Sequence, residues 1–129
     1  MATIRFTPVE AKATVIAVAI LAGLPMIASC NPQRQQDCEK IVSAMKELDE
    51  GAPNAAIVDQ VNQQVQALQL QDQPLQIYAE NYRNTLSGLS SSLRLNESSS
   101  APDGTDDVIK SQLKIARTDS RDVQRYCSQ

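Results

Sequence analysis

Apolar or small side chains recur every three or four residues through most of this chain, and this spacing restricts the possible fold more than any other feature. The clearest example is the C-terminal segment, where successive steps are four, three, four, three and four residues long. The positions are Ile109, Leu113, Ala116, Ser120, Val123 and Cys127. An amphipathic α-helix buries such a stripe along one face, whereas a half-buried strand alternates with a period of two. The segment is therefore predicted to be helical from the loop at 96–107 to the C-terminus.

Two earlier segments carry the same helical spacing. The first runs from about 33 to 50, and its apolar positions are Cys38, Ile41, Val42, Met45 and Leu48. Gly51 suits the position just after a helix, and Pro53 prevents this helix from continuing. The second starts at the predicted N-cap Asn54, and its apolar positions are Ile57, Val58, Val61, Val65 and Leu68. It ends in an alternating pattern at 65–71, where a short strand is the alternative.

A third helix is predicted after the QDQP break, with Asp72 or Gln73 as its N-cap and Pro74 at its first position. Its stripe consists of Leu75, Tyr78, Tyr82, Leu86, Leu89 and Leu93. The two tyrosines are interpreted as core residues with their hydroxyl groups at the edge of the bundle, rather than as a ligand surface. The serine-rich stretch 96–107 is the one clear loop. Its acidic residues lack the spacing of a calcium-binding EF-hand, so Thr105 is instead predicted to cap the fourth helix.

Four amphipathic helices joined by short breaks predict an all-α fold, an up-down-up-down four-helix bundle over residues 34–129. Cys38 lies on the predicted buried stripe near the start of the first helix, and Cys127 lies on that of the fourth helix near its end. These two helix ends meet at the same pole of such a bundle. We therefore expect one disulfide that closes the bundle, because the N-terminal segment of the chain predicts export and oxidising compartments favour a bridge. The alternative is two separate thiols.

An uncharged run of twelve residues, Ala13 to Leu24, follows a modestly positive N-terminal stretch. Its length suits the hydrophobic region of a secretory signal and is short for a membrane-spanning helix, which is the alternative interpretation. Four residues follow shortly afterwards: Ile27, Ala28, Ser29 and Cys30. They resemble the lipobox of bacterial lipoproteins, in which an aliphatic residue, two small residues and an invariant cysteine direct lipid attachment and then cleavage.

The lipobox resemblance implies a lipoprotein signal peptide at 1–29, a lipidated anchor and short linker at 30–33, and the helical domain after them. Cys30 would carry a diacylglycerol and a further acyl chain such as palmitate. Two or three chains hold a protein firmly to a bilayer, whereas one chain does so only marginally. The expected location is an exported, membrane-anchored one that faces the periplasm or the thylakoid lumen.

Four features carry a second resemblance: the lipobox, a cysteine before the first helix, the stretch LQLQDQPLQIYAENY at 68–82, and the terminal pair Tyr126 and Cys127. They are similar to a cyanobacterial family of small, exported, cysteine-bounded helical proteins. These motifs are structural, so the resemblance implies no catalytic residues. In size, anchor and architecture the chain is also similar to the four-helix lumenal lipoproteins of photosystem II. A likeness of architecture alone is a weak basis for function.

The composition argues against several classes of function. Histidine is absent, so the chain has no ordinary general base near neutral pH and no imidazole metal ligand. The net charge of −3 is mild, whereas nucleic-acid binding needs a clustered basic face. The serines lie in a loop or on polar faces without a base. We expect no catalytic residues, no metal site and no cofactor beyond the covalent lipid.

What remains favours a non-catalytic accessory lipoprotein that binds a membrane or envelope protein complex; the alternative is a small-ligand-binding helical bundle. One candidate contact is the glutamine-rich face of the second helix. The other is an arginine ridge on the fourth helix, consisting of Arg117, Arg121 and Arg125. The ridge is preferred because arginine is enriched at interfaces and pairs well with carboxylates. It could also be an ordinary exposed surface interleaved with Asp119 and Asp122.

Overall fold

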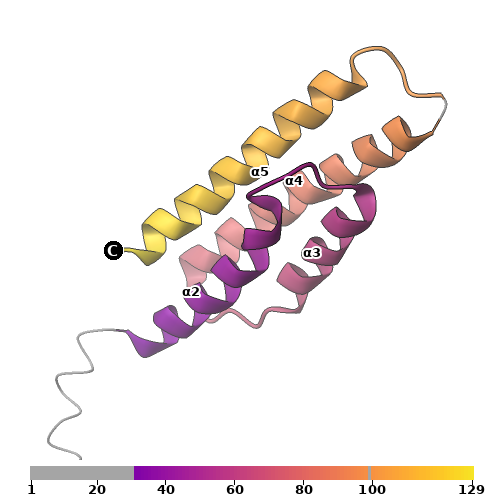
Figure 1. Cartoon of the computed structure of the whole chain (residues 1–129). Coiled ribbons are helices and arrows are strands. Elements are labelled where there is room, and N and C mark those ends of the chain that lie inside the picture. Colours follow the sequence, from indigo (N-terminus) through magenta and orange to yellow (C-terminus); the bar gives the residue numbers. More distant parts are fainter. Residues whose placement is uncertain (1–30, 99) are drawn as a thin grey trace, which may run out of the picture. The chain divides into compact units, whose positions relative to one another are not determined.

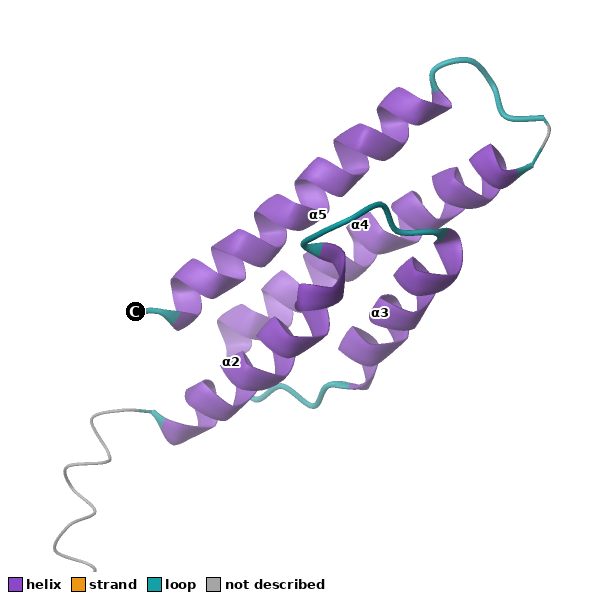
Figure 2. Ribbon diagram, in the orientation of Figure 1, coloured by secondary structure: helices purple, strands orange, loops and turns teal. Residues whose placement is uncertain are grey.

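The computed structural model describes residues 31–98 and 100–129 of the chain. The elements within these ranges are α2 (Pro32–Met45), the 3-10 turn η2 (Lys46–Leu48), α3 (Ala55–Ala67), α4 (Gln73–Glu97) and α5 (Thr105–Cys127) (Figure 1). Successive helices run in opposite directions, and loops join them (Figure 2). The structure confirms the predicted all-α, up-down-up-down four-helix bundle. The predicted signal peptide at 1–29 lies outside the described residues.

The stripes predicted from the sequence meet in one hydrophobic core. Its most deeply buried members, each at most 2% exposed, are Ile41, Met45, Leu48, Ala55, Val58, Val61, Val65, Leu75, Tyr82, Leu86, Leu89, Ala116 and Val123. The prediction was wrong for Ile57, which is 38% exposed because the buried face of α3 runs through its neighbour Val58. Tyr82 is a core residue as predicted, while Tyr78 packs against the core and stays partly exposed.

The two halves of the bundle differ in length. Helices α4 and α5 have 25 and 23 residues, whereas α2 and α3 have 14 and 13. Helix α4 packs extensively against both α5 and α3. The α4–α5 hairpin is therefore the frame of the domain, and the shorter helices complete its core.

Two of the predicted helix starts are confirmed. The side chain of Asn54 accepts a hydrogen bond from the Ile57 backbone N–H at 2.9 Å and caps α3. Asp72, one of the two predicted caps for α4, accepts from the Leu75 N–H at 3.2 Å, and Pro74 follows in the first turn. Each side chain satisfies a backbone donor that the first turn of a helix leaves without an intrahelical acceptor.

The predicted cap of α5 was wrong. Gly104, with φ of 87°, precedes the helix, and Thr105 is its first residue. The hydroxyl of Thr105 donates to the Pro102 carbonyl oxygen at 2.7 Å, so it is occupied by the loop and does not cap the helix. A left-handed backbone conformation favours glycine, so the turn is at Gly104 and the helix begins at the next residue, Thr105. Asp106 and Asp107 lie in the first turn, where their charge favours the helix dipole.

Two other local predictions are corrected. The first helix was expected to reach residue 50, but α2 ends at Met45 and tightens into η2 through Leu48. Such 3-10 turns are frequent at helix ends. The short strand considered at 65–71 does not form within the described chain: α3 continues to Ala67, and residues 68–72 are a loop.

Candidate functional site

The predicted lipidation residue and the rest of the lipobox lie outside the described residues; they are Ile27, Ala28, Ser29 and Cys30. The described chain begins at Asn31, and α2 begins at the next residue, Pro32. A lipid on Cys30 would thus be separated from the first helix by a single residue.

The predicted disulfide is present between Cys38 and Cys127, whose Cα atoms are 5.7 Å apart. It joins α2 to the end of α5 across a sequence separation of 89 residues. The first and last helices therefore meet at one pole of the bundle, as the two cysteine-bearing stripes predicted. We call this end the disulfide pole.

Aromatic and polar contacts reinforce the disulfide pole. The guanidinium of Arg34 lies 4.1 Å from the centre of the Tyr126 ring and donates to the Tyr126 carbonyl oxygen. The Tyr126 hydroxyl donates to the Asp72 carboxylate at 2.9 Å, and its ring packs against Tyr78. Burial and the neighbouring Asp72 raise the pKa of Tyr126, so the hydroxyl stays protonated and keeps donating. These contacts join α2, α4 and α5.

A buried carboxylate holds the loop between α3 and α4 at the same pole. Asp37 of α2 is 0% exposed, and its Oδ2 accepts the backbone N–H groups of Gln71 and Asp72 at 2.6 and 2.8 Å. Burial alone would raise the pKa of Asp37, but these bonds and one from Gln33 outweigh it and lower the pKa. The sequence analysis missed this residue. The available signal was its position four residues before Ile41, on the buried stripe.

The contact between Asp59 and Ser90 resembles the carboxylate–hydroxyl pair of a catalytic site. The residues around it indicate a structural role instead. The Ser90 hydroxyl donates to one oxygen of Asp59, and Arg94 binds the other oxygen. The hydroxyl of Ser90, together with Arg94, lowers the pKa of Asp59. A carboxylate with a lowered pKa is a poor general base. The cluster therefore serves to tie α3 to α4.

The three residues of the arginine ridge have different environments in the structure. Arg117 is partly buried and donates to the backbone carbonyl oxygens of Leu48 and Gly51, at 3.1 and 2.6 Å. Arg121 and Arg125 are exposed; Arg121 donates to the Arg117 carbonyl oxygen, and Arg125 pairs with Asp122 at 3.3 Å. Arg117 thus has a structural task that the sequence pattern did not indicate.

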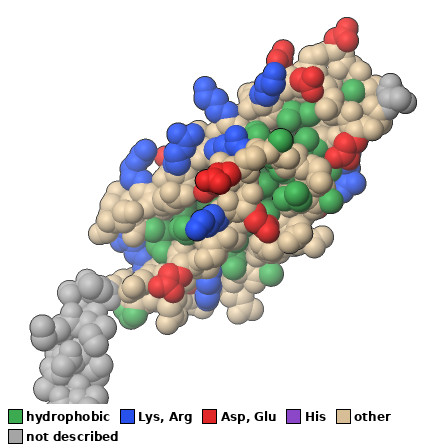
Figure 3. Space-filling view, viewed as in Figure 1, with side chains coloured by type: hydrophobic (Ala, Val, Ile, Leu, Met, Phe, Trp, Pro, Cys, Tyr) green, Lys and Arg blue, Asp and Glu red, His purple; other side chains and the backbone are tan. Residues whose placement is uncertain are grey.

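Two lysines extend the ridge into a longer basic surface. Residues Lys110, Lys114, Arg117, Arg121 and Arg125 follow each other at steps of four, three, four and four along α5, and we call them the basic stripe. Such steps keep side chains on one side of a helix, over about 22 Å here. Figure 3 shows basic side chains gathered along the edge of the molecule that α5 forms.

A second surface, on the opposite flank of α5 and the adjoining outer side of α4, is formed by uncharged side chains, and the exposed Glu80 of α4 lies at its border. Helical spacing places these residues on it: Ile77, Asn81, Asn84, Gly88, Ser91 and Leu95 from α4, and Val108, Ser111, Gln112 and Ile115 from α5. We call it the uncharged face. Gly88 and Gln112 lie against each other where the two helices meet, since a Cβ on Gly88 would be 2.9 Å from Gln112 Nε2. Four large aliphatic side chains on this face, including Ile77, are 43–57% exposed.

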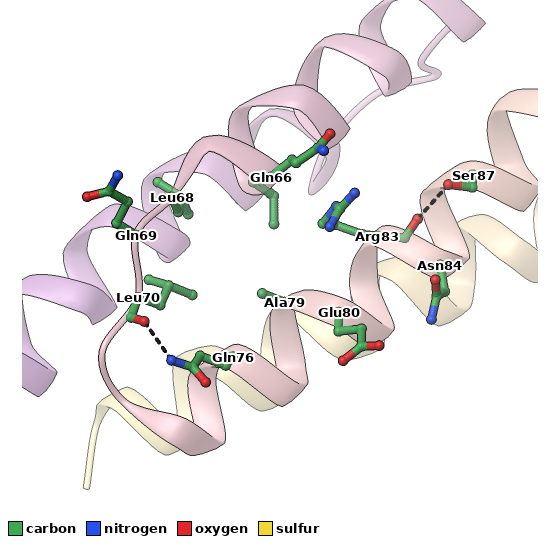
Figure 4. A pocket seen from close by; sticks show the side chains of 11 residues that line it. Gln66, Leu68, Gln69, Leu70, Gln76, Ala79, Glu80, Arg83, Asn84 and Ser87 are labelled. Carbon is green, nitrogen blue, oxygen red and sulfur yellow. Dashed lines mark hydrogen bonds between the residues drawn. The ribbon is translucent and has the colours of Figure 1, made fainter.

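An open groove of about 410 Å³ lies between the end of α3, the loop that follows it and the first half of α4 (Figure 4). Leu68, Leu70 and Ala79 contribute apolar surface. Three glutamines of the predicted glutamine-rich segment also line it, together with Glu80 and Arg83; they are Gln66, Gln69 and Gln76. Gln76 donates to the Leu70 carbonyl oxygen at 2.7 Å, which fixes one wall.

The described ranges contain no group of three or more carboxylate or cysteine side chains arranged to hold a metal ion. None of the helices in residues 31–98 and 100–129 has both the length and the apolarity that crossing a bilayer requires.

No protein-family model, curated protein or solved structure matches this chain.

Proposed function

We propose that this protein is an exported, lipid-anchored accessory protein without catalytic activity, which binds a protein partner at a membrane surface. We also propose that the chain belongs to the cyanobacterial family that it resembles, whose members are small, exported, cysteine-bounded helical proteins. The lipobox-like sequence ending at Cys30 supports the anchor. The Cys38–Cys127 disulfide supports the exported location, because such bonds persist mainly in oxidising compartments.

The uncharged face is the observation that carries the binding role. Charged residues are depleted at the centre of protein interfaces, and a few apolar side chains supply most of the binding energy. On this face Leu95, Val108 and Ile115 are 43–49% exposed, and they share it with small and amide side chains such as Ser91 and Gln112. Between residues 108 and 118 of α5, the charged side chains are Lys110, Lys114 and Arg117. All three belong to the basic stripe on the other flank of the helix. The uncharged face is thus suited to contact another protein.

The anchor is tested by replacing Cys30. The Cys30→Ser chain is expected to move from the membrane to the soluble fraction or to remain as the uncleaved precursor. The measurement is fractionation of cells followed by intact mass of the mature chain. Normal processing and membrane retention of Cys30→Ser would rule out the anchor.

The docking face is tested by placing charge on it. Leu95→Glu and Ile115→Glu should each reduce partner recovery after crosslinking in native membranes, because an unpaired carboxylate would be desolvated in the interface. Ile57→Glu is the matched control, since Ile57 is a similarly exposed aliphatic residue on α3. Equal recovery for all three variants would exclude this face. A crosslinked product of twice the monomer mass would instead identify a second copy as the partner.

Small-ligand binding is the second candidate function, and the α3–α4 groove is the observation that favours it. Its volume lies within the roughly 300–1,000 Å³ of common ligand sites, and its amides together with Glu80 and Arg83 offer donors and acceptors. Native mass spectra of protein taken from its own membrane would then contain a bound small molecule. That mass should disappear in Ala79→Trp, which fills the floor of the groove.

A further inference from the structure

The basic stripe differs in charge from the rest of the molecule. Helix α5 carries five basic and four acidic side chains, and its portion from 110 to 125 carries five basic and only two acidic ones. The other described residues carry five basic and ten acidic side chains. A positive surface on an otherwise negative domain attracts a negatively charged partner and orients the domain towards it.

The surroundings of the stripe indicate the kind of negative partner. The exposed residues beside it between Lys110 and Arg125 are the polar Thr118 and Gln124, and the exposed Asp106 and Asp107 precede it in the first turn of α5. The exposed aliphatic residues Val108 and Ile115 lie about a third of a turn away, on the flank that faces α4. A protein interface needs buried apolar or aromatic anchors at its centre, and the stripe offers none. Charge without such anchors suits a diffuse negative surface, such as lipid headgroups.

The position of the stripe agrees with a membrane contact. Its last residue, Arg125, lies in the final turn of α5, two residues before the disulfide-bonded Cys127. The bridge and Arg34 hold the start of α2 at this same pole. A lipid on Cys30 would therefore attach the pole at which the stripe ends, and the domain could lie with α5 along the bilayer. The acyl chains on Cys30 would supply the anchor, and a polybasic surface beside negatively charged headgroups would add an orientation to it.

We propose that the basic stripe lies against negatively charged headgroups of the leaflet that holds the Cys30 lipid. The inference rests on the proposed lipid anchor and adds an orientation to it. The uncharged face lies on the other flank of α5, so this orientation turns it away from the bilayer and leaves it accessible to a protein partner. Arg117 contributes its positive charge to this membrane contact while its guanidinium stays hydrogen-bonded to the carbonyl oxygens of Leu48 and Gly51.

The orientation is measured with nitroxide labels on the mature lipidated protein in vesicles. One label replaces Thr118, beside the stripe, and the other replaces Ser91, on the uncharged face; both positions are exposed. In phosphatidylcholine vesicles containing phosphatidylglycerol, a water-soluble relaxation agent should reach position 118 several-fold less than position 91. The difference should vanish in phosphatidylcholine alone. It should also fall between about 0.1 and 1 M salt, where the screening length shortens from about 10 to 3 Å.

Charge variants separate the stripe from the anchor. Lys114→Gln with Arg121→Gln should lower binding of the lipid-free Cys30→Ser mature chain to the phosphatidylglycerol vesicles about 25-fold, since each of the two cations near such a surface contributes roughly fivefold. Lys40→Gln with Lys46→Gln removes the same charge from α2 and η2, where both lysines are exposed, and should change binding far less. Circular dichroism verifies that both variants are folded.

The possible failures are distinct. If the wild-type chain is found without a lipid, the proposed anchor fails, while binding of the lipid-free chain still supports the stripe. If the two labels are equally accessible in both kinds of vesicle, or if the two charge variants behave alike, the stripe proposal is wrong. Protection of position 118 that requires native membrane proteins and is absent in pure lipid would overturn it in favour of an acidic protein.

Discussion

The α4–α5 hairpin and the α2 helix are stabilised in different ways. The hairpin is formed by helices of 25 and 23 residues that pack along each other, and few polar contacts cross between them. Helix α2 has 14 residues and is fixed at both ends by specific bonds. Its first half is held by the Cys38–Cys127 bridge and by Asp37, and the turn after it is held by Arg117.

The difference follows from the area that each element can bury. Burial of apolar surface stabilises in proportion to area, so a short helix gains less than a long one. Isolated helices of this length are also marginal in water. A short helix with only a few deeply buried side chains, such as Ile41 and Met45, therefore depends on point contacts. We expect substitutions at these contacts to destabilise α2 more than equally polar substitutions on the hairpin.

Removal of the disulfide should have the largest effect. Replacing Cys38 and Cys127 by Ala is expected to lower the free energy of unfolding by about 2–5 kcal/mol, because the unfolded chain loses the closure of a long loop. For a domain of this size this lowers the melting temperature by at least about 10 °C. Thermal unfolding checks the total effect. Hydrogen exchange checks the comparison, since the protection of α2 should fall before that of α4.

If α2 and α4 lose protection together in the double cysteine variant, the bundle unfolds as one unit and the distinction between its halves is wrong. The single variants Cys38→Ala and Cys127→Ala serve as controls, because each also breaks the bridge but leaves one thiol.

Loss of the Asp37 carboxylate should come next. Asp37→Ala leaves the N–H groups of Gln71 and Asp72 without their acceptor, at a cost of about 2–4 kcal/mol. Asp119→Ala on the hairpin is the matched carboxylate control. Burial and the charge of Asp122 raise the pKa of Asp119, so its removal should be neutral or stabilising near pH 7. Urea unfolding of both variants measures the contrast, and similar losses would contradict it.

The pH dependence of stability has opposite signs for these two carboxylates. The folded pKa of Asp37 is below the ordinary value of 3.8, so its contribution is complete above that pH and is lost as the pH falls through the lowered pKa. The folded pKa of Asp119 is raised, so its ionisation destabilises the fold and protonation relieves this as the pH falls. The acid-induced loss of stability should therefore be smaller in Asp37→Asn and larger in Asp119→Asn than in the unsubstituted protein.

The frame of the fold could be predicted from the sequence because the relevant information is periodic. Tyr82, Leu86 and Leu89 are all deeply buried, and their spacing alone identifies the buried face of α4. The disulfide was predictable because Cys38 and Cys127 lie on two such stripes, at helix ends that the topology brings together.

Helix ends were less predictable, because they depend on the conformation of single residues. Thr105 has the chemistry of a cap, but the left-handed backbone of Gly104 determines where the turn before α5 lies. The sequence shows both residues and does not show which of them the loop uses to begin the helix.

The candidate surfaces were only partly predictable. The arginines recur every four residues, so a basic surface could be expected, but the partners of Arg117 lie 69 and 66 residues away in η2 and the turn after it. Such distant backbone contacts leave no local pattern. The uncharged face was missed because it combines residues from two helices, and the relative rotation of α4 and α5 is needed to place Gly88 against Gln112. The position of the lipid anchor stays a prediction from the lipobox.

Arg117 provides a smaller test of how the end of α2 is held. Arg117→Ala removes the donors to the Leu48 and Gly51 carbonyl oxygens, and we expect a loss of about 1–2 kcal/mol. Arg121→Ala, one turn further along the same helix, should change stability by no more than about 0.5 kcal/mol. Chemical unfolding compares the two. Equal effects would mean that the contacts of Arg117 add nothing to the stability of the turn at η2.

The smallest effect is expected on the hairpin, at Gly88. Alanine in a helix interior is favoured over glycine by about 0.5–1 kcal/mol, but the new Cβ would lie 2.9 Å from Gln112 Nε2. The contact is with the end of a flexible side chain, and Gln112 Oε1 is buried without a hydrogen-bond partner, so the amide loses little by moving towards solvent. Gly88→Ala is therefore expected to stabilise the protein slightly. Combining it with Gln112→Ala removes the contact altogether and should add at most a few tenths of a kcal/mol to the gain. If Gly88→Ala instead destabilises the protein and Gln112→Ala restores it, the hairpin also depends on a point contact, and its difference from α2 is one of degree.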